Sequence, residues 1–218
     1  MPSPTPHEAH FRIVKIGLLL LAIAVPLAVW LIWREEIGVF VANRELAPVF
    51  EKHVQGLYEK AEPVVKAAGG YNDTPPPPPE PARRGPNAVW IQVQVIAHSN
   101  RYEYVVTLDD DFGRVPADMR AESPAKAETA VLLFPKSARV GHYVPVDSRG
   151  DPTQGAPVLS AFVEVLDVHV VDLKSNRYLG RKRFQWNPKQ RVDLLKESHI
   201  QERNSKEVVA WYTALSER

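Results

Sequence analysis

Hydrophobic and polar positions follow three successive patterns along the 218-residue chain, and each pattern predicts a different kind of element. Residues 16–33 (IGLLLLAIAVPLAVWLIW) carry no charge, residues 34–68 place apolar side chains three and four positions apart, and many residues after 87 alternate between apolar and polar. These patterns are typical of a membrane span, an amphipathic helix and half-buried strands, in that order. The chain is therefore predicted to be helical first and β-rich afterwards.

The apolar run predicts a transmembrane helix over residues 13–33. Eighteen helical residues extend about 27 Å, close to the ~30 Å hydrocarbon core of a bilayer. Trp30 and Trp33 stand at the end of the run, where indole rings favour the membrane interface, and Arg34 follows them. A cleaved signal peptide has a shorter apolar region of ~7–15 residues and a small-residue cleavage site, which is missing here. We therefore expect an uncleaved signal anchor, preceded by a disordered tail at residues 1–12.

The expected orientation places the large domain outside the cytoplasm. Arg12 and Lys15 precede the run, and Arg34 and Arg44 follow it, so basic residues are balanced on its two sides. A short N-terminal tail inside and a large domain outside is the commoner arrangement for a single span. The predicted localisation is the cell membrane, with one pass and an extracytoplasmic domain.

A juxtamembrane helical segment is predicted over residues 34–68. Its stripe of apolar side chains, at steps of four and three residues, consists of Phe50, Val54, Leu57, Ala61 and Val64. The stripe covers only about two heptads, fewer than a coiled coil needs. Two interpretations remain open: the stripe packs on the protein's own domain, or it contacts a second chain, in which case Phe50, Val54 and Leu57 are partner contacts.

Residues 69–86 (GGYNDTPPPPPEPARRGP) are predicted to be a proline-rich linker between the helical segment and the rest. Gly69 and Gly70 end the helix. The five consecutive prolines at residues 75–79 favour polyproline II, a stiff extended rod. Such a rod can bind an aromatic groove, but a spacer is the more usual role between two structured segments.

Residues 87–218 are predicted to form a β-rich domain with a C-terminal helix. Residues 89–95 and 102–108 each alternate in polarity and predict a hairpin. Further strands are predicted at residues 129–134, 139–146, 158–173 and 178–186, with a loop at residues 113–126. The parity of the apolar positions changes near Val165 and Leu166, which indicates a β-bulge or a strand buried on both faces, and the alternation of Asp167 and His169 favours the bulge.

The last predicted helix starts at a capping box formed by Asn204 and Glu207. Its apolar face consists of Val208, Trp211, Tyr212 and Leu215 and should pack against the sheet. The predicted fold class is α+β: an N-terminal transmembrane helix and a juxtamembrane helix, then a small antiparallel β-sandwich or open barrel with a C-terminal helix.

Composition removes several functional classes. The net charge of +1 gives no general attraction to nucleic acid, and the lack of cysteine excludes disulfides, thiolate catalysis and cysteine-based zinc sites. The sequence predicts no cofactor and no metal, and it identifies no small-molecule substrate. The predicted partners are the lipid bilayer and either a protein partner or a second copy of the chain.

Two groups of residues have side chains of the kinds found in metal or catalytic sites. Asp109, Asp110 and Asp111 are oxygen ligands of the kind Ca²⁺ uses, but six to eight ligands are needed, so a solvated turn is the favoured interpretation. Ser160, Asp167, His142 and His169 contain the residue types of a serine–histidine–acid set. Such a set requires convergence in space and an oxyanion hole. Histidines on the surface or paired across strands explain the same residues more simply.

The only concentration of basic residues lies on the last predicted strand. Arg181 and Arg183 face one way, whereas Lys182 faces the other way with Phe184 and Trp186. Basic and aromatic residues in alternation can hold an anionic polymer. Charge on an edge strand more often prevents aggregation. Arg181 and Arg183 are the predicted partner contacts on this strand.

Together these features predict a non-enzymatic, single-pass membrane protein whose extracytoplasmic domain binds a protein or serves as an accessory subunit of an envelope complex. One alternative is a membrane-anchored hydrolase or carbohydrate-active enzyme with unrecognised site residues. Another is a binder of anionic polymer or lipid headgroups through the basic strand.

Overall fold

The computed structural model of the chain describes residues 6–70, 82–98, 101–143, 149, 159–187 and 204–217. It divides into two compact units, Met1–Ala42 and Asn43–Arg218. The described residues form three α-helices, two short 3₁₀ helices and five strands. This composition confirms the α+β class. The proline run at residues 75–79 lies outside the described residues.

Helix α1 (Pro6–Phe50) begins in the first unit and continues through Pro26 without interruption. Within the first unit most of its described apolar side chains are exposed, including Ile23 at 61% and Phe40 at 66%. No helix among the residues with described side chains is long and apolar enough to cross a membrane. The predicted span includes residues 13–21, 31 and 32, whose side chains lie outside that set. The transmembrane helix therefore stays a prediction.

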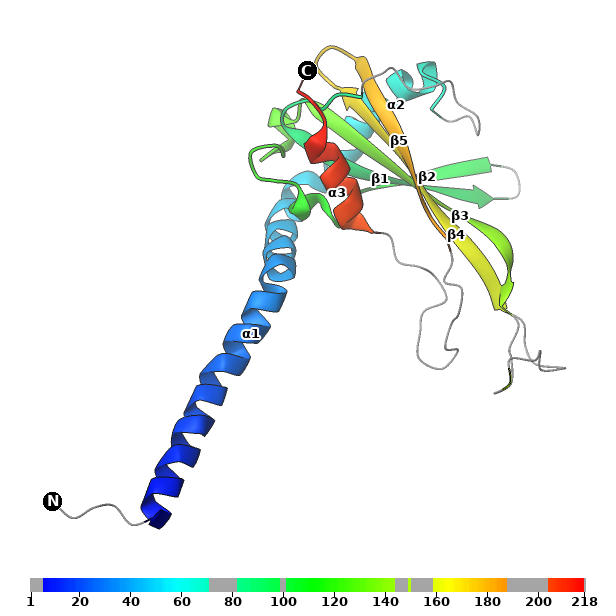
Figure 1. Cartoon of the computed structure of the whole chain (residues 1–218). Helices are drawn as coiled ribbons and strands as arrows, with labels where there is room; N and C mark the ends of the chain where they lie inside the picture. The colour runs from blue at the N-terminus through cyan, green and yellow to red at the C-terminus, as the bar shows by residue number, and fades with distance from the viewer. Residues whose placement is uncertain are drawn as a thin grey trace. The chain divides into compact units, whose positions relative to one another are not determined.

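The second unit is built on one five-stranded sheet (Figure 1). Its strands are β1 (Ala88–His98), β2 (Arg101–Leu108), β3 (Thr129–Tyr143), β4 (Leu159–Asp172) and β5 (Arg177–Trp186). Their order in the sheet is β2-β1-β3-β4-β5. The β1–β2 hairpin and the adjacent pairs β3–β4 and β4–β5 are antiparallel, whereas β1 and β3 are parallel.

The predicted antiparallel sandwich or barrel is therefore wrong, because the described strands form a single open, mixed sheet. After β2 the chain makes a long connection that contains η1 (Phe112–Arg114) and η2 (Pro124–Lys126) before β3 begins. Strand β2 ends opposite Ile91, near the start of β1, and the connection takes the chain to the other side of β1 at that same end, so β3 runs parallel to β1.

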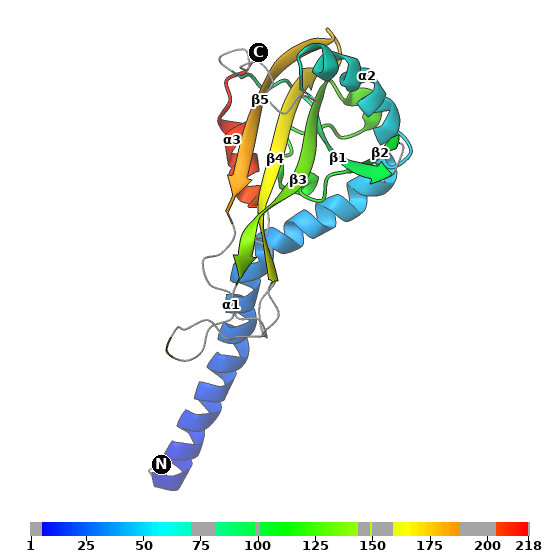
Figure 2. The same cartoon turned by 90° about the vertical axis from the view of Figure 1, so that its right-hand side faces the viewer.

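Two helices cover the two faces of the sheet, so no second sheet is needed (Figure 2). Helix α2 (Val54–Ala67) lies against β2, β3, β4 and β5. Helix α3 (Ser205–Ala214) packs on the other face, where the ring of Tyr212 meets Trp90 edge-on at 5.7 Å. Asn204 caps α3 by accepting a hydrogen bond from the Glu207 backbone N–H, as predicted.

The long central strands differ from the sequence prediction in two ways. Strand β3 runs through Pro135, where a break was predicted. Pro135 lies beyond the last residue of β3 that pairs with β1, Leu133, so this part of β3 has a ladder on one side only and tolerates a missing N–H. The predicted bulge at Val165 and Leu166 is also wrong, because both residues pair in regular register with β3 and β5. The other predicted interpretation holds: β4 is buried on both faces.

Candidate functional site

The predicted partner contacts on the apolar stripe are core residues of the domain. Phe50, Val54 and Leu57 are 0%, 4% and 6% exposed and belong to the main hydrophobic cluster. Of the two interpretations of the stripe, the structure agrees with packing on the protein's own domain.

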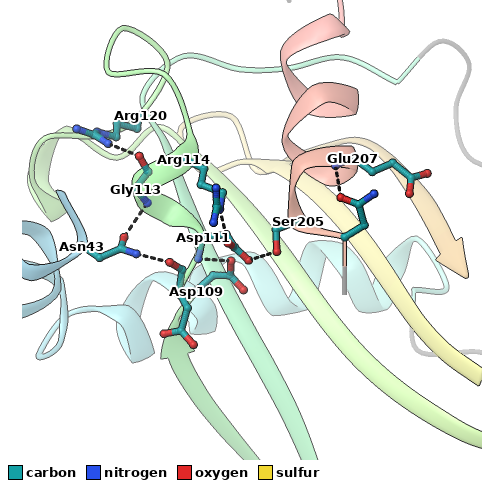
Figure 3. A network of polar contacts seen from close by, with 10 residues as sticks. Asn43, Asp109, Asp111, Gly113, Arg114, Arg120, Ser205 and Glu207 are labelled. Atoms are coloured by element: carbon teal, nitrogen blue, oxygen red, sulfur yellow. Dashed lines mark hydrogen bonds and ion pairs between the residues drawn. The ribbon is translucent and has the colours of Figure 1, made fainter. Parts of the chain in front are cut away.

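The acidic cluster after β2 holds the domain's elements together (Figure 3). Asp109 is buried and its Oδ1 accepts a hydrogen bond from the Asp111 backbone N–H at 3.1 Å. The Asp111 carboxylate accepts from Arg114 Nε at 2.9 Å and from the Ser205 hydroxyl at the start of α3. Within the described residues, no group of three or more acidic or histidine side chains is arranged to hold a metal ion. The cluster is therefore a structural junction.

Asn43 joins the end of α1 to the same loop. Its side-chain oxygen accepts a hydrogen bond from the Gly113 backbone N–H at 2.7 Å, and its amide donates to the Asp110 carbonyl. Arg120 Nη1 donates to the Gly113 carbonyl at 3.0 Å from the far side of the loop. These bonds fix the loop that precedes the crossover to β3.

Arg181 and Arg183 lie on a row of polar residues that crosses the α2 face of the sheet. In register, Asp167 of β4 stands between Phe134 and Arg183, and His169 stands between Leu132 and Arg181. Residues that pair across strands point to the same face. The predicted sidedness of Arg181 and Arg183 is consistent with this register, and β5 is an edge strand of the described sheet, as predicted.

Asp167 is the centre of this row. It is 7% exposed and accepts two hydrogen bonds from Arg183, from Nε at 2.6 Å and from Nη2 at 2.9 Å, while Lys136 Nζ lies 3.5 Å away. Burial raises the pKa of the Asp167 carboxyl, but the hydrogen bonds and charge of Arg183, with the charge of Lys136, outweigh burial and hold it below its usual value. Asp167 is therefore an anion that orients the Arg183 side chain.

His169 is the most deeply buried polar residue of the row, at 1% exposure. Its Nδ1 lies 2.8 Å from the Tyr178 hydroxyl, and Phe134 packs edge-on against its ring. Its Nε2 has no hydrogen-bond partner among the described residues. Burial lowers the pKa of His169 to about 4, and the nearby charges of Arg181, Lys136 and Arg183 act in the same direction against that of Asp167. His169 is thus neutral at pH 7.

The structure does not bring a serine–histidine–acid set together. Ser160 pairs with His142 across β3 and β4, whereas His169 lies nine residues further along β4, about 30 Å away in an extended strand. His142 contacts the Arg139 guanidinium. Among the described residues, the structure therefore does not support a serine–histidine–acid triad.

Two cavities open on the domain surface. One of about 670 Å³ is lined by Glu59, Pro63 and Ala67 of α2 and by Asn176 and Tyr178 at the start of β5. The other, of about 370 Å³, is bordered by Arg84, Met119 and Glu217, among others. Neither has His142, His169 or the Asp109–Asp111 cluster in its wall. These cavities therefore do not assemble the chemistry that a hydrolase would need.

Lys136 and Tyr178 also belong to the polar row, although no pattern in the sequence predicts it. Lys136 falls between two predicted strands, and Tyr178 falls at the start of another. Strand register decides which side chains meet, and register cannot be read from the sequence. The shared parity of Asp167 and His169 was the available signal that they face one way.

Comparison of the chain with protein-family models, with curated proteins and with solved structures finds no match in any of the three.

The Asn43 junction predicts a measurable loss of stability. Replacing Asn43 by alanine removes both side-chain hydrogen bonds and leaves the part-buried Gly113 N–H without its acceptor. We expect N43A to lower the free energy of unfolding by about 1–3 kcal/mol in urea titrations. The control Q55A removes only a surface contact to Glu59 on α2 and should change stability by no more than ~0.5 kcal/mol. Equal effects of the two variants would contradict the role given to Asn43.

Burial of neutral His169 predicts that acid destabilises the domain. The unfolded histidine titrates near 6.5 and the folded one near 4, so between these values the unfolded state binds more protons. Stability should be complete above pH 6.5 and fall as the pH drops toward 4, by on the order of 3 kcal/mol. The lowered pKa of Asp167 acts in the same direction at a lower pH, because the stability that this carboxylate contributes is lost only below about pH 4.

Unfolding measured by fluorescence between pH 4 and 7 checks this expectation. H169Q keeps a hydrogen-bonding group near Tyr178 but does not titrate, so its stability should vary less over this interval. H142Q, which removes an exposed histidine instead of the buried one, provides the control variant. A parent chain whose stability is flat from pH 7 to pH 4 would rule out the buried neutral state.

Proposed function

We propose that the chain is a single-pass membrane protein whose α+β domain, on the extracytoplasmic side, binds a protein partner as an accessory subunit of an envelope complex. The observation that carries the membrane part is the exposure of apolar side chains along α1. Ile23, Val25, Leu27, Val29 and Trp30 are each more than half exposed. A surface of this kind is unfavourable in water at about 25 cal/mol per Å², and lipid removes that cost.

A binding role is favoured over catalysis by what the domain's polar residues do. Asp109 and Asp111 brace a loop, Asp167 holds Arg183, and His169 is a buried neutral side chain in contact with Tyr178. Each polar group named here has a structural use. The described surface instead offers a basic edge strand, which is a feature of recognition rather than of bond-breaking.

Membrane attachment is tested by alkaline carbonate extraction of the full chain. The parent should remain in the membrane pellet. The double variant V25K/V29K should move to the supernatant, because each lysine in the middle of a span costs about 3 kcal/mol and the pair outweighs the favourable apolar residues. The matched control V95K/V140K places the same change at exposed positions of the domain and should stay in the pellet. Extraction of the parent chain would overturn the anchor.

The side of the membrane and the partner need separate measurements. Protease added to cells that are stripped of any outer layer but keep an intact cell membrane should cleave the domain. Crosslinking in the same membranes should give a defined species larger than the monomer. Protection of the domain until the cell membrane is lysed would reverse the orientation. Recovery of the monomer alone would contradict partner binding.

A further inference from the structure

Strand β5 is the most strongly charged element of the described sheet. Its ten residues, RYLGRKRFQW, contain Arg177, Arg181, Lys182 and Arg183 and no acidic residue, which gives a net charge of +4. The strand forms one edge of the sheet. An edge strand is the position at which another extended chain can be added by backbone pairing.

The charge of β5 is reinforced from the neighbouring strands. On the α2 face, Arg181 and Arg183 are joined by Lys136 of β3, and the only charged residue of opposite sign in this row is Asp167. With His169 neutral, three cations and one anion leave a local charge of +2. Arg183 and Lys136 are each 44% exposed, so this charge is presented to the surface.

One part of this edge already accepts an extended segment of the chain. The Arg83 backbone N–H donates to the Leu179 carbonyl at 3.1 Å. Gly180, with a φ of +145°, lies so close to Ala82 that a Cβ on the glycine would stand 2.6 Å from the Ala82 Cβ. The edge therefore accommodates a neighbouring backbone at Leu179–Gly180, and the rest of the strand continues beyond that contact.

We propose that the outer edge of β5 from Arg181 to Trp186 is the docking site for an extended, acidic segment of a partner protein, which adds to the sheet as a sixth strand. This inference rests on the proposed protein-binding function and specifies its partner surface. Carboxylates at every second position of the added strand would stand beside Arg181 and Arg183, because side chains of paired strands share a face at about 5 Å.

Charge argues for a partner rather than for the chain's own remaining segments. Residues 187–203 contain four Lys and Arg and three Asp and Glu, so they do not complement a basic strand. Residues 71–81 and 144–158 have net charges of −2 and −1 but contain six and three prolines, which lack the N–H that a strand ladder needs. The occupant that fits is therefore a separate acidic strand.

The aromatic residues of β5 argue against a nucleic acid or another stacked polymer. Phe184 and Trp186 are 3% and 7% exposed, because they pack on the α3 side of the sheet, where Phe184 meets Trp211 edge-on. Buried rings cannot stack on bases, so the exposed part of this strand offers charge and backbone alone.

The test uses the full chain in detergent and a labelled ten-residue peptide of alternating glutamate and valine. Fluorescence anisotropy should show binding that weakens as salt is raised, because exposed ion pairs are screened. A peptide with lysine in place of glutamate should not bind. The glutamate peptide methylated on alternate backbone nitrogens should bind weakly, since it cannot form the strand ladder.

Matched variants locate the site. R181Q/K182Q should weaken the glutamate peptide about fivefold, because Arg181 faces the glutamates and Lys182 adds positive charge on the other face of the same edge. R139Q/K174Q makes the same change in charge away from the β5 edge and should bind like the parent. Arg183 is retained in both variants, because its loss would leave buried Asp167 with Lys136 alone. Circular dichroism should show that both variants fold as the parent does.

Three results would overturn the proposal. The first is equal weakening by the two double variants. The second is absence of peptide binding to the folded parent, which would leave protection from aggregation as the role of the charges. The third is binding of inorganic polyphosphate without binding of the peptide. The measurement does not depend on the anchor. If the chain binds the peptide but is extracted by carbonate, the docking site is supported and the membrane proposal is refuted. If the chain stays in the membrane pellet but does not bind the peptide, the membrane proposal is supported and the docking site is refuted.

Discussion

Burial of both faces of one sheet is the constraint on which the described domain depends. Helix α2 covers one face and α3 the other, so strands β3 and β4 have no face left for water in their central parts. Apolar residues at consecutive positions, such as Val170 and Val171, are stabilised only when both directions lead into a core. The same covering explains why the parity change in β4 needs no bulge.

Burial of both faces also determines the charge states and the partners of the polar residues on β4. A buried carboxylate is tolerated when it is paired and hydrogen-bonded, and Asp167 has both an ion pair and two hydrogen bonds with Arg183. A buried histidine is tolerated when it is neutral, which is the state that burial enforces on His169. The edge strand β5 supplies the partners for both residues, Arg183 and Tyr178. Its basic character is thus partly a requirement of the strand beside it.

Local sequence signals predicted the elements whose stability is local. The alternation at residues 89–95 and 102–108 identified the β1–β2 hairpin, and the Asn204–Glu207 spacing identified the start of α3. The parallel pairing of β1 and β3 was not predicted, because it depends on where a twenty-residue connection returns and not on any pattern within the strands. Pro135 was misinterpreted for a related reason. Its effect depends on whether a third strand lies beside it, which only the sheet order reveals.

The polar row shows why the site was harder to predict than the fold. Arg181 and Arg183 were identified from charge alone, but the meaning of their charge depends on what stands opposite them. Opposite Arg183 is a buried aspartate that fixes the guanidinium, and opposite Arg181 is a histidine that carries no charge at neutral pH. Arg183 is thus held in place by Asp167, whereas Arg181 stands opposite the neutral His169. Arg183 is ordered because the buried Asp167 requires it, and a surface that also bound carboxylates would lose less conformational entropy when one of its cations is already ordered.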